Sequence, residues 1–412
     1  MKNILILLDH YLPMASANGI CCENIAGSLI ENGYNVNIVA YAYDDKRYEE
    51  INGACVYYTE YVKKPSAGAL SKLAFYTKWL LCPSRYPITE IKERTWAIIE
   101  TASRVIEEKS IDTLICVHLP IETLIAGVRL KEKYPEINCV SYMLDSLSGG
   151  FVPRLLPGKF CRARKIKWEN NLQKSFDFTV LMESCRNQYD AVFSASTWYK
   201  NAVFGDIPLF KAKEQKETDL ADSSKAYTMS YVGTMGDGVR TPYYFLKLLG
   251  LIEAPNISFA YAGKNNCDEN TFASAMENVK EKDNVTVTAL GMLSHSEALS
   301  VVEGAEILVN FGNVVPTMVP SKIFEYMSYG KPIISTYSID SEPCLPYLRK
   351  YPCVLLIDER DMDIEKKARE LEDFISTNRN AKVDVKGIED IFYANTPQAF
   401  VKALRERFGE NS

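Results

Sequence analysis

The chain has 412 residues, of which 47% are hydrophobic and 24% are charged. At roughly 150 residues per domain, this length predicts two or three globular domains. The 47 Lys and Arg residues and the 53 Asp and Glu residues give a formal net charge of -6. This balance argues against nucleic acid as the main ligand, because binding a phosphate backbone requires a basic excess.

The sequence also argues against a membrane-spanning or disulfide-rich protein. No stretch approaches the roughly 18–20 apolar residues that a transmembrane helix needs. The apolar run near the N-terminus is too short for the core of a signal peptide. The 11 cysteines are scattered and form no C-x-x-C pair, which is typical of free thiols in a reducing compartment. We therefore expect a cytoplasmic protein.

Short β-branched runs alternate with amphipathic stretches along the first half of the chain. This pattern predicts a parallel sheet flanked by helices. The strands are expected at 3–9, 35–41, 55–60, 112–118, 138–144 and 178–182. The helices are expected at about 18–32, 66–81, 88–108, 120–134 and 160–175.

A second alternating series begins after the charged segment 211–225, which we interpret as an exposed linker. Its strands are expected at 227–233, 258–263, 284–291, 305–312, 331–335 and 353–358. Its helices are expected at about 242–252, 269–281, 295–303, 321–329 and 362–378, with a last helix at 396–407. The sequence thus predicts an α/β protein with two Rossmann-like domains that face each other across a cleft.

Ligands of open α/β sheets bind beyond the carboxyl ends of the strands, so the residues that follow each strand are the first candidates. The loop at 9–19 lacks a dinucleotide fingerprint; its small residues either admit a ligand to the helix N-terminus or form an ordinary turn. His118 closes one strand and would either donate a hydrogen bond to a ligand or cap the next helix. Asp145 closes another strand, with the same two interpretations.

The loop at 233–242 contains three glycines, Arg240 and a proline at the start of the next helix. Backbone N–H groups on one side and a guanidinium on the other would form a cradle for phosphate. Glycine-rich turns also occur without any ligand. The arginine favours the binding interpretation.

The segment 310–332 carries the most specific pattern. Ser321 is expected to cap a short helix that begins with Lys322, where a cation faces the positive end of the helix dipole unless an anion is bound. Glu325 lies three residues later, on the same face. Lysine and glutamate in this arrangement suit a nucleoside diphosphate, with Lys322 on phosphate and Glu325 on the ribose hydroxyls. The alternative is a simple salt bridge between the two.

The sequence here resembles a known family. VPSKIFEYMSYGKPII at 319–334, YVGTMGDGVRTP at 231–242 and YAGK at 261–264 are similar to the donor domain of GT-B glycosyltransferases, and most similar to glycosyltransferase family 4. The resemblance implies an acceptor-binding domain at 1–208 and a donor-binding domain at 209–392. It also implies that the C-terminal helix, within 393–412, crosses back to the N-terminal domain.

The resemblance implies transfer of a sugar from a nucleotide-sugar, with retention at the anomeric carbon and without a metal. Arg240 and Lys322 match the pair that neutralises the leaving diphosphate, Glu325 matches the ribose ligand, and His118 matches a histidine near the sugar. Further donor-binding positions are Gly19, Gly233, Gly291, Met292, Pro320 and Ser321. No cofactor is implied other than the donor substrate itself, for which a UDP-sugar is the first expectation.

The sequence departs from the family at Thr317, where a second glutamate that contacts the transferred sugar is often found. Asn313 or the backbone at 317–319 would then take its place. The motif Asp361-Met362-Asp363 resembles the metal-binding D-x-D of a different glycosyltransferase fold, but it opens an expected helix, where carboxylates complement the dipole. We interpret it as a helix cap and propose no metal.

Two basic segments stand out from the acidic chain. Residues 61–85 and 154–167 contain no acidic residue and interleave lysines and arginines with aromatic side chains. This composition is typical of helices on anionic membranes, although a solvated helix face is the usual explanation. We expect peripheral contact at the inner face of the cell membrane, with a saccharide or polyprenyl-linked saccharide as acceptor.

The resemblance places the enzyme in the biosynthesis of cell-surface polysaccharide. Two other readings of the same fold remain open. One is a nucleotide-sugar 2-epimerase, which relies on carboxylates and histidines around the sugar. The other is a non-catalytic subunit of a glycosyltransferase complex, which would be consistent with Thr317.

Overall fold

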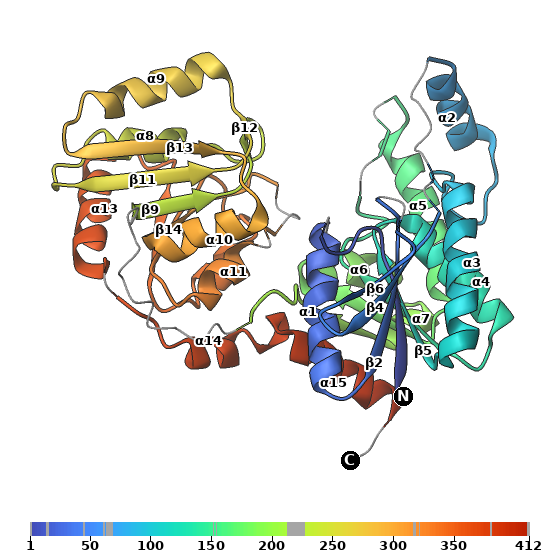
Figure 1. The fold of residues 1–412 in the computed structure, drawn as a ribbon. Helices are drawn as coiled ribbons and strands as arrows, with labels where there is room; N and C mark the ends of the chain where they lie inside the picture. Colours follow the sequence, from blue (N-terminus) through green and yellow to red (C-terminus); the bar gives the residue numbers. More distant parts are fainter. Residues whose placement is uncertain are drawn as a thin grey trace. The chain divides into compact units, whose positions relative to one another are not determined.

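The computed structural model describes residues 2–13, 16–43, 46–60, 62, 69–150, 152–153, 155–211, 227–315, 319–320, 322–379 and 381–409. Contacts divide the chain into two compact units (Figure 1). The N-terminal unit is Met1–Leu209 together with Ala394–Ser412, and the C-terminal unit is Phe210–Tyr393. Each unit contains one large sheet covered by helices.

The sheet of the N-terminal unit has eight strands in the order β3-β4-β2-β1-β5-β6-β7-β8. They are β1 (Asn3–Leu7), β2 (Asn35–Ala40), β3 (Tyr48–Ile51), β4 (Ala54–Tyr58), β5 (Thr113–His118), β6 (Asn138–Met143), β7 (Phe178–Met182) and β8 (Ala202–Gly205). All neighbouring strands are parallel except β3 and β4. The helices are α1 (Ala17–Glu31), α2 (Ala69–Leu81), α3 (Lys92–Lys109), α4 (Ile121–Lys133), α5 (Gly158–Gln173), α6 (Arg186–Phe193), α7 (Thr197–Lys200) and α15 (Pro397–Phe408).

The first strand shows why this sheet is covered on both faces. Leu5 and Leu7 pack into one hydrophobic core, whereas Ile4 and Ile6 pack into another. Successive side chains of a strand point to opposite faces, so an uninterrupted apolar run predicts a strand that is buried on both sides.

The C-terminal helix α15 belongs to the N-terminal unit. Its Phe400 ring lies 4.7 Å from the ring of Tyr142 on β6, and its Val401 and Leu404 share a core with Ile25 of α1. The last helix therefore packs against α1 and the sheet of the N-terminal unit. The predicted return of the C-terminal helix is confirmed.

The sheet of the C-terminal unit has six parallel strands in the order β13-β11-β9-β14-β15-β16. They are β9 (Tyr227–Val232), β11 (Ile257–Ala262), β13 (Val285–Gly291), β14 (Ala305–Phe311), β15 (Ile333–Tyr337) and β16 (Val354–Asp358), and a small pair is formed by β10 (Met235–Gly236) and β12 (Asn265–Asn266). The helices are α8 (Tyr243–Leu249), α9 (Glu269–Lys280), α10 (His295–Gly304), α11 (Lys322–Ser328), α12 (Leu345–Leu348), α13 (Ile364–Asn378) and α14 (Val385–Ile391).

The predicted fold class, an α/β protein with two Rossmann-like parallel sheets, is confirmed. The elements that were not predicted are short or lie at an edge, and they include β3, β8, β10, β12, α6, α7, α12 and α14. The expected linker lies outside the described residues except for Lys211. Among the helices that the structure describes, none is long and apolar enough to cross a bilayer.

Candidate functional site

Three adjacent strands of the C-terminal unit end at glycines. The Gly233 N–H donates to the Ala262 carbonyl at 2.8 Å, and the Gly263 N–H donates to the Gly291 carbonyl at 2.7 Å. A Cβ at Gly263 would lie 2.3 Å from the Gly233 carbonyl oxygen, and its φ is +118°. Only glycine fits there, so the backbone segments that follow β9 and β11 pack directly against each other at the carboxyl edge of the sheet.

The loop that carries Arg240 is closed by its own backbone. The Gly236 N–H donates to the Arg240 carbonyl at 2.9 Å, and the Arg240 N–H donates back to Gly236 at 3.1 Å. Gly238 turns the chain between them with a φ of +75°, which is the left-handed conformation that glycine favours. These contacts fix the point from which the guanidinium extends.

The side chain of Arg240 is partly buried, and its Nε has no hydrogen-bond partner among the residues that the structure describes. An arginine nitrogen removed from water without a partner is unfavourable. In the described part of the chain, none of Arg240, Lys322 and Glu325 forms an ion pair. The simple salt bridge between Lys322 and Glu325 is therefore not observed.

Helix α11 is held against the end of β9 by one tyrosine. The Val232 N–H donates to the Tyr326 hydroxyl at 2.9 Å, and the Tyr326 ring is buried. Lys322 and Glu325 are half-buried, whereas the other residues of α11 are buried. Burial lowers the pKa of the Lys322 ammonium, Glu325 raises it in part, and Arg240 lowers it further. The two cations therefore lie close enough to repel each other.

Glu342 is a residue that the sequence analysis missed. Its buried carboxylate accepts hydrogen bonds from the backbone N–H groups of Asn313 at 3.2 Å, Cys344 at 2.7 Å and Leu345 at 2.9 Å. Burial raises its pKa. The carboxylate thus joins the loop after β14 to the start of α12. In the sequence, Glu342 is marked only by its position shortly after an expected strand. Many acidic residues have such a position, so it does not single out Glu342.

The loop after β14 is also tied to the loop after β9. The Val314 N–H donates to the Val239 carbonyl at 2.9 Å, next to Arg240. The Asn313 Oδ1 accepts from the Val315 N–H at 3.1 Å, so this oxygen already has a partner within its own loop. These contacts hold the loop after β14 beside the segment that carries Arg240.

The other donor-binding candidates of this unit differ in their accessibility. Met292 is 75% exposed and follows Gly291, whose φ is +69°. Pro320 is buried. Ser321 and Thr317 lie outside the described residues. An exposed methionine beside bare backbone offers an apolar platform at the edge of the sheet.

His118 in the N-terminal unit is buried, with 1% of its surface exposed. Its Nδ1 lies 2.8 Å from the Asp145 carbonyl oxygen, which can only accept, so Nδ1 carries the proton. Burial lowers the His118 pKa to about 4. The neutral ring therefore has an unprotonated, buried Nε2, for which the described residues supply no hydrogen-bond partner. The expectation that His118 donates to a ligand is wrong in this tautomer, because Nε2 accepts hydrogen bonds.

The first helices of this unit are capped in different ways. Helix α4 begins after Pro120 without a side-chain cap, so His118 does not cap it. At α1, the Gly19 N–H donates to the Ser16 hydroxyl at 3.1 Å, and that hydroxyl donates to Asp9 at 2.7 Å. Gly19 is buried in the first turn, and its N–H is already used by the cap.

The D-x-D motif forms part of a helix cap. The Asp363 side chain accepts from the Lys366 N–H at 3.0 Å at the start of α13. Asp361 accepts from the Asp363 N–H at 3.0 Å and lies 3.5 Å from the Lys367 ammonium. The interpretation of this motif as a cap is confirmed.

No protein-family model matches this chain, and no curated protein matches it in sequence. Solved structures do match over nearly the full length. Sucrose-phosphate synthase from Thermosynechococcus elongatus superposes with a TM-score of 0.60 at 12% identity, over 99% of both chains. An alpha,alpha-trehalose-phosphate synthase (UDP-forming) from Burkholderia xenovorans, in complex with glucose-6-phosphate, gives 0.61 at 10% identity, over 99% of this chain and 100% of its own.

Anabaena HepE in complex with UDP and glucose gives a TM-score of 0.54 at 12% identity, over 98% of this chain and 100% of its own. At such low identity, the likeness is one of fold. The structural class is therefore that of the GT-B proteins, with two Rossmann-like domains in one chain.

Proposed function

We propose that this protein is a glycosyltransferase that moves a sugar from a nucleoside-diphosphate sugar to a saccharide or lipid-linked saccharide. The observation that carries the proposal is the pair Arg240 and Lys322, which lies beside the glycine-lined edge of the C-terminal sheet without an ion-pair partner among the described residues. Two neighbouring, partly buried cations are unfavourable in the free protein. A diphosphate would neutralise both.

The same pair would supply the chemistry. As the bond between the anomeric carbon and the diphosphate oxygen breaks, negative charge develops on the leaving group, and the two cations stabilise it. The acceptor hydroxyl forms the new bond to the anomeric carbon and passes its proton to the departing phosphate. Attack from the side of the leaving group gives retention. Arg240 and Lys322 would then neutralise the leaving diphosphate, which in other glycosyltransferases is the role of a metal ion.

The surrounding residues fit the rest of the donor. The Glu325 carboxylate would accept hydrogen bonds from two ribose hydroxyls, since no described residue forms an ion pair with it. Gly291 and Met292 would line the base, and Gly233 and Pro320 would border the diphosphate. We assign the acceptor to the N-terminal unit, at the edge of its sheet where His118 ends β5.

The structural neighbours support the choice of donor. HepE was solved with UDP and glucose, and the trehalose-phosphate synthase is described as UDP-forming. By analogy we place UDP-sugars first among the donors, and cell-surface polysaccharide biosynthesis at the inner face of the cell membrane as the setting.

A thermal-shift screen against UDP-, GDP- and ADP-sugars tests the donor site. We expect one nucleotide to raise the melting temperature, because a ligand that binds only the folded state stabilises it. Incubation of that donor with and without saccharide acceptors then tests the reaction. Acceptor-dependent release of the nucleoside diphosphate supports the proposal. An isomerised sugar without acceptor would instead identify a 2-epimerase, and absence of binding and turnover would identify a non-catalytic subunit.

A further inference from the structure

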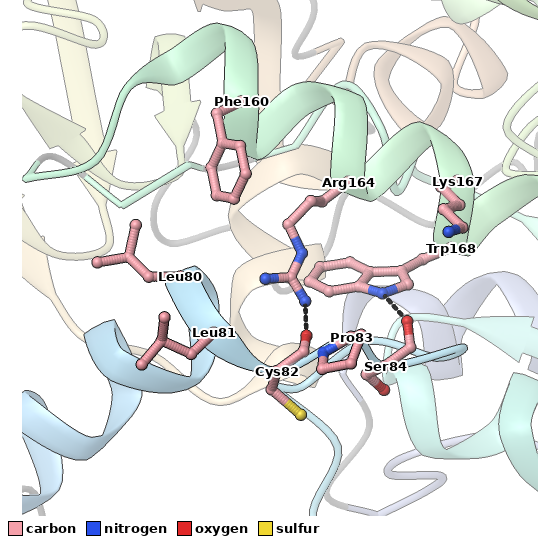
Figure 2. A pocket seen from close by; sticks show the side chains of 9 residues that line it. All are labelled: Leu80, Leu81, Cys82, Pro83, Ser84, Phe160, Arg164, Lys167 and Trp168. Atoms are coloured by element: carbon pink, nitrogen blue, oxygen red, sulfur yellow. Dashed lines mark hydrogen bonds between the residues drawn. The ribbon is translucent and has the colours of Figure 1, made fainter.

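Two acid-free segments that are distant in sequence meet in the N-terminal unit. No Asp or Glu occurs at 61–89 or at 146–168. The described parts of these segments include α2 and most of α5. The Trp79 ring of α2 lies 5.0 Å from the Trp168 ring of α5, and the Trp168 Nε1 donates to the Ser84 carbonyl at 2.9 Å (Figure 2).

Arg164 joins the two helices. Its guanidinium donates to the carbonyls of Trp79 and Cys82 at the C-terminal end of α2, and it lies 5.0 Å from the centre of the Trp168 ring. A cation here also complements the negative end of the α2 dipole. Arg164 therefore fixes the orientation of α2 and is not itself available to a ligand.

This orientation leaves the opposite face of α2 uncovered. Trp79 is 2% exposed, whereas Leu73 is 66%, Leu80 is 53% and Leu81 is 75% exposed. Leu73 and Leu80 are seven residues apart and lie on one side of the helix. Exposed leucines grouped in this way are unfavourable in water and mark an interaction surface.

A cavity of about 220 Å³ lies between α5 and the end of α2 that carries Leu80 and Leu81. Leu80 and Leu81 line one wall, and Phe160, Arg164 and Lys167 of α5 line the other (Figure 2). Apolar and basic side chains thus line the same cavity.

The rim of this surface carries cations. Lys78, Lys159 and Lys167 are exposed, and in the described chain none of the three forms an ion pair. The surface is therefore apolar at its tip and positive around it. This distribution complements a bilayer with anionic headgroups, where leucines enter the acyl boundary and lysines lie at the phosphates.

We propose that the α2–α5 surface, comprising Leu73, Leu80, Leu81 and Phe160 with the rim Lys78, Lys159 and Lys167, docks the protein on an anionic lipid bilayer. The docking surface itself is argued from the residues above; only its role, bringing the protein to a lipid-linked acceptor, rests on the proposed function. The chain enters α2 after β4 and α5 after β6, whose carboxyl ends lie at the same edge as that of β5. His118 ends β5 at this edge, so docking brings the acceptor side of the unit to the headgroups, where a lipid-linked saccharide presents its sugar.

Flotation of the full chain with vesicles tests the surface directly. Wild type is expected to float with vesicles of phosphatidylcholine and phosphatidylglycerol at low salt, to dissociate at high salt, and to remain unbound with phosphatidylcholine alone. Replacing Lys78, Lys159 and Lys167 with Gln should lower partitioning by about fivefold per lysine. The pair Leu80→Ser and Leu81→Ser should lower it at least about tenfold, because two buried apolar side chains are lost.

The matched control is Lys247→Gln with Leu251→Ser, an exposed lysine and leucine at the end of α8 in the C-terminal unit, and it should float like wild type. Circular dichroism and nucleotide titration of every variant separate this inference from the proposed function, because donor binding should not change. Wild type that does not float with either vesicle overturns the docking surface, as does equal loss in the control. A dimer in solution that Leu80→Ser and Leu81→Ser dissolve would assign the surface to a second copy of the chain instead.

Discussion

Burial and the Arg240 guanidinium both lower the pKa of Lys322, although Arg240 lies in the loop after β9 and Lys322 begins α11, which follows β14. Burial makes the larger contribution to the lowered pKa, and Glu325 opposes it. The free protein therefore holds two cations that repel each other at the carboxyl edge of the C-terminal sheet. A bound diphosphate would neutralise both cations and remove the repulsion between them. The predictions for nucleotide binding depend on this neutralisation.

Nucleotide binding should take up protons at alkaline pH. Free Lys322 has a pKa below the usual value for lysine, and a bound diphosphate raises it, so the ammonium is regained on binding in the window between the two values. The affinity for UDP should fall as the pH rises through the pKa of the free protein. Calorimetric titrations in two buffers of different ionisation enthalpy measure the uptake. Lys322→Ala should lack this uptake, and identical proton counts in both proteins would contradict the assignment.

Glu325→Gln should weaken binding of UDP by about 10- to 100-fold, because a charged acceptor for ribose hydroxyls becomes a neutral one. Titration with 2′-deoxy-UDP tests whether the ribose 2′-hydroxyl is the group that Glu325 contacts. Wild type should lose affinity for the deoxynucleotide, whereas Glu325→Gln should bind both nucleotides nearly alike. If the two losses simply add, Glu325 does not contact the ribose.

Much of the fold could be predicted from sequence because the buried strands are continuous apolar runs. β3 was missed because YEEI is half exposed and pairs antiparallel at the sheet edge. β8 was missed because its four residues are only partly buried. For such elements, the partner strand decides the structure more than the local sequence does.

Arg240, Lys322 and Glu325 could be proposed as donor-site candidates from sequence because each lies in a local motif. Glu342 could not, since its role depends on N–H groups that come from two loops. The basic character of Arg164 was visible in the sequence. Its contacts with the end of α2 were not, because they depend on how two helices pack.

His118 should make the N-terminal unit sensitive to acid. Its pKa is about 4 in the folded protein and about 6.5 when unfolded. The unfolded state binds more protons between these values, so stability is complete above about pH 6.5 and is lost as the pH falls toward 4. Wild type should lose about 1–2 kcal/mol of unfolding free energy from pH 7 to pH 5 through this residue. His118→Asn should lose less over the same interval in urea titrations, and an equal loss would contradict the neutral, buried histidine.

Gly312→Ala and Gly27→Ala should change stability in opposite directions. A Cβ at Gly312 would lie 2.4 Å from the Thr336 carbonyl oxygen, whereas at Gly27 it would meet nothing within 4 Å. Gly312→Ala should therefore cost about 1–3 kcal/mol through overpacking against the end of β15. Gly27→Ala, within α1, should gain about 0.5–1 kcal/mol. Chemical denaturation measures both, and a neutral Gly312→Ala would show that β14 and β15 are packed less closely than described.

The rate of sugar transfer by Lys322→Ala tests the central claim most directly. The account predicts that kcat falls by a factor of about 100 to 1,000, as expected when a group that stabilises developing charge is removed. The circular dichroism spectrum should be unchanged. Lys280→Ala, which removes an exposed lysine at the end of α9, should retain wild-type turnover. A Lys322→Ala enzyme whose kcat stays within a few-fold of wild type would contradict the assignment of the leaving-group site.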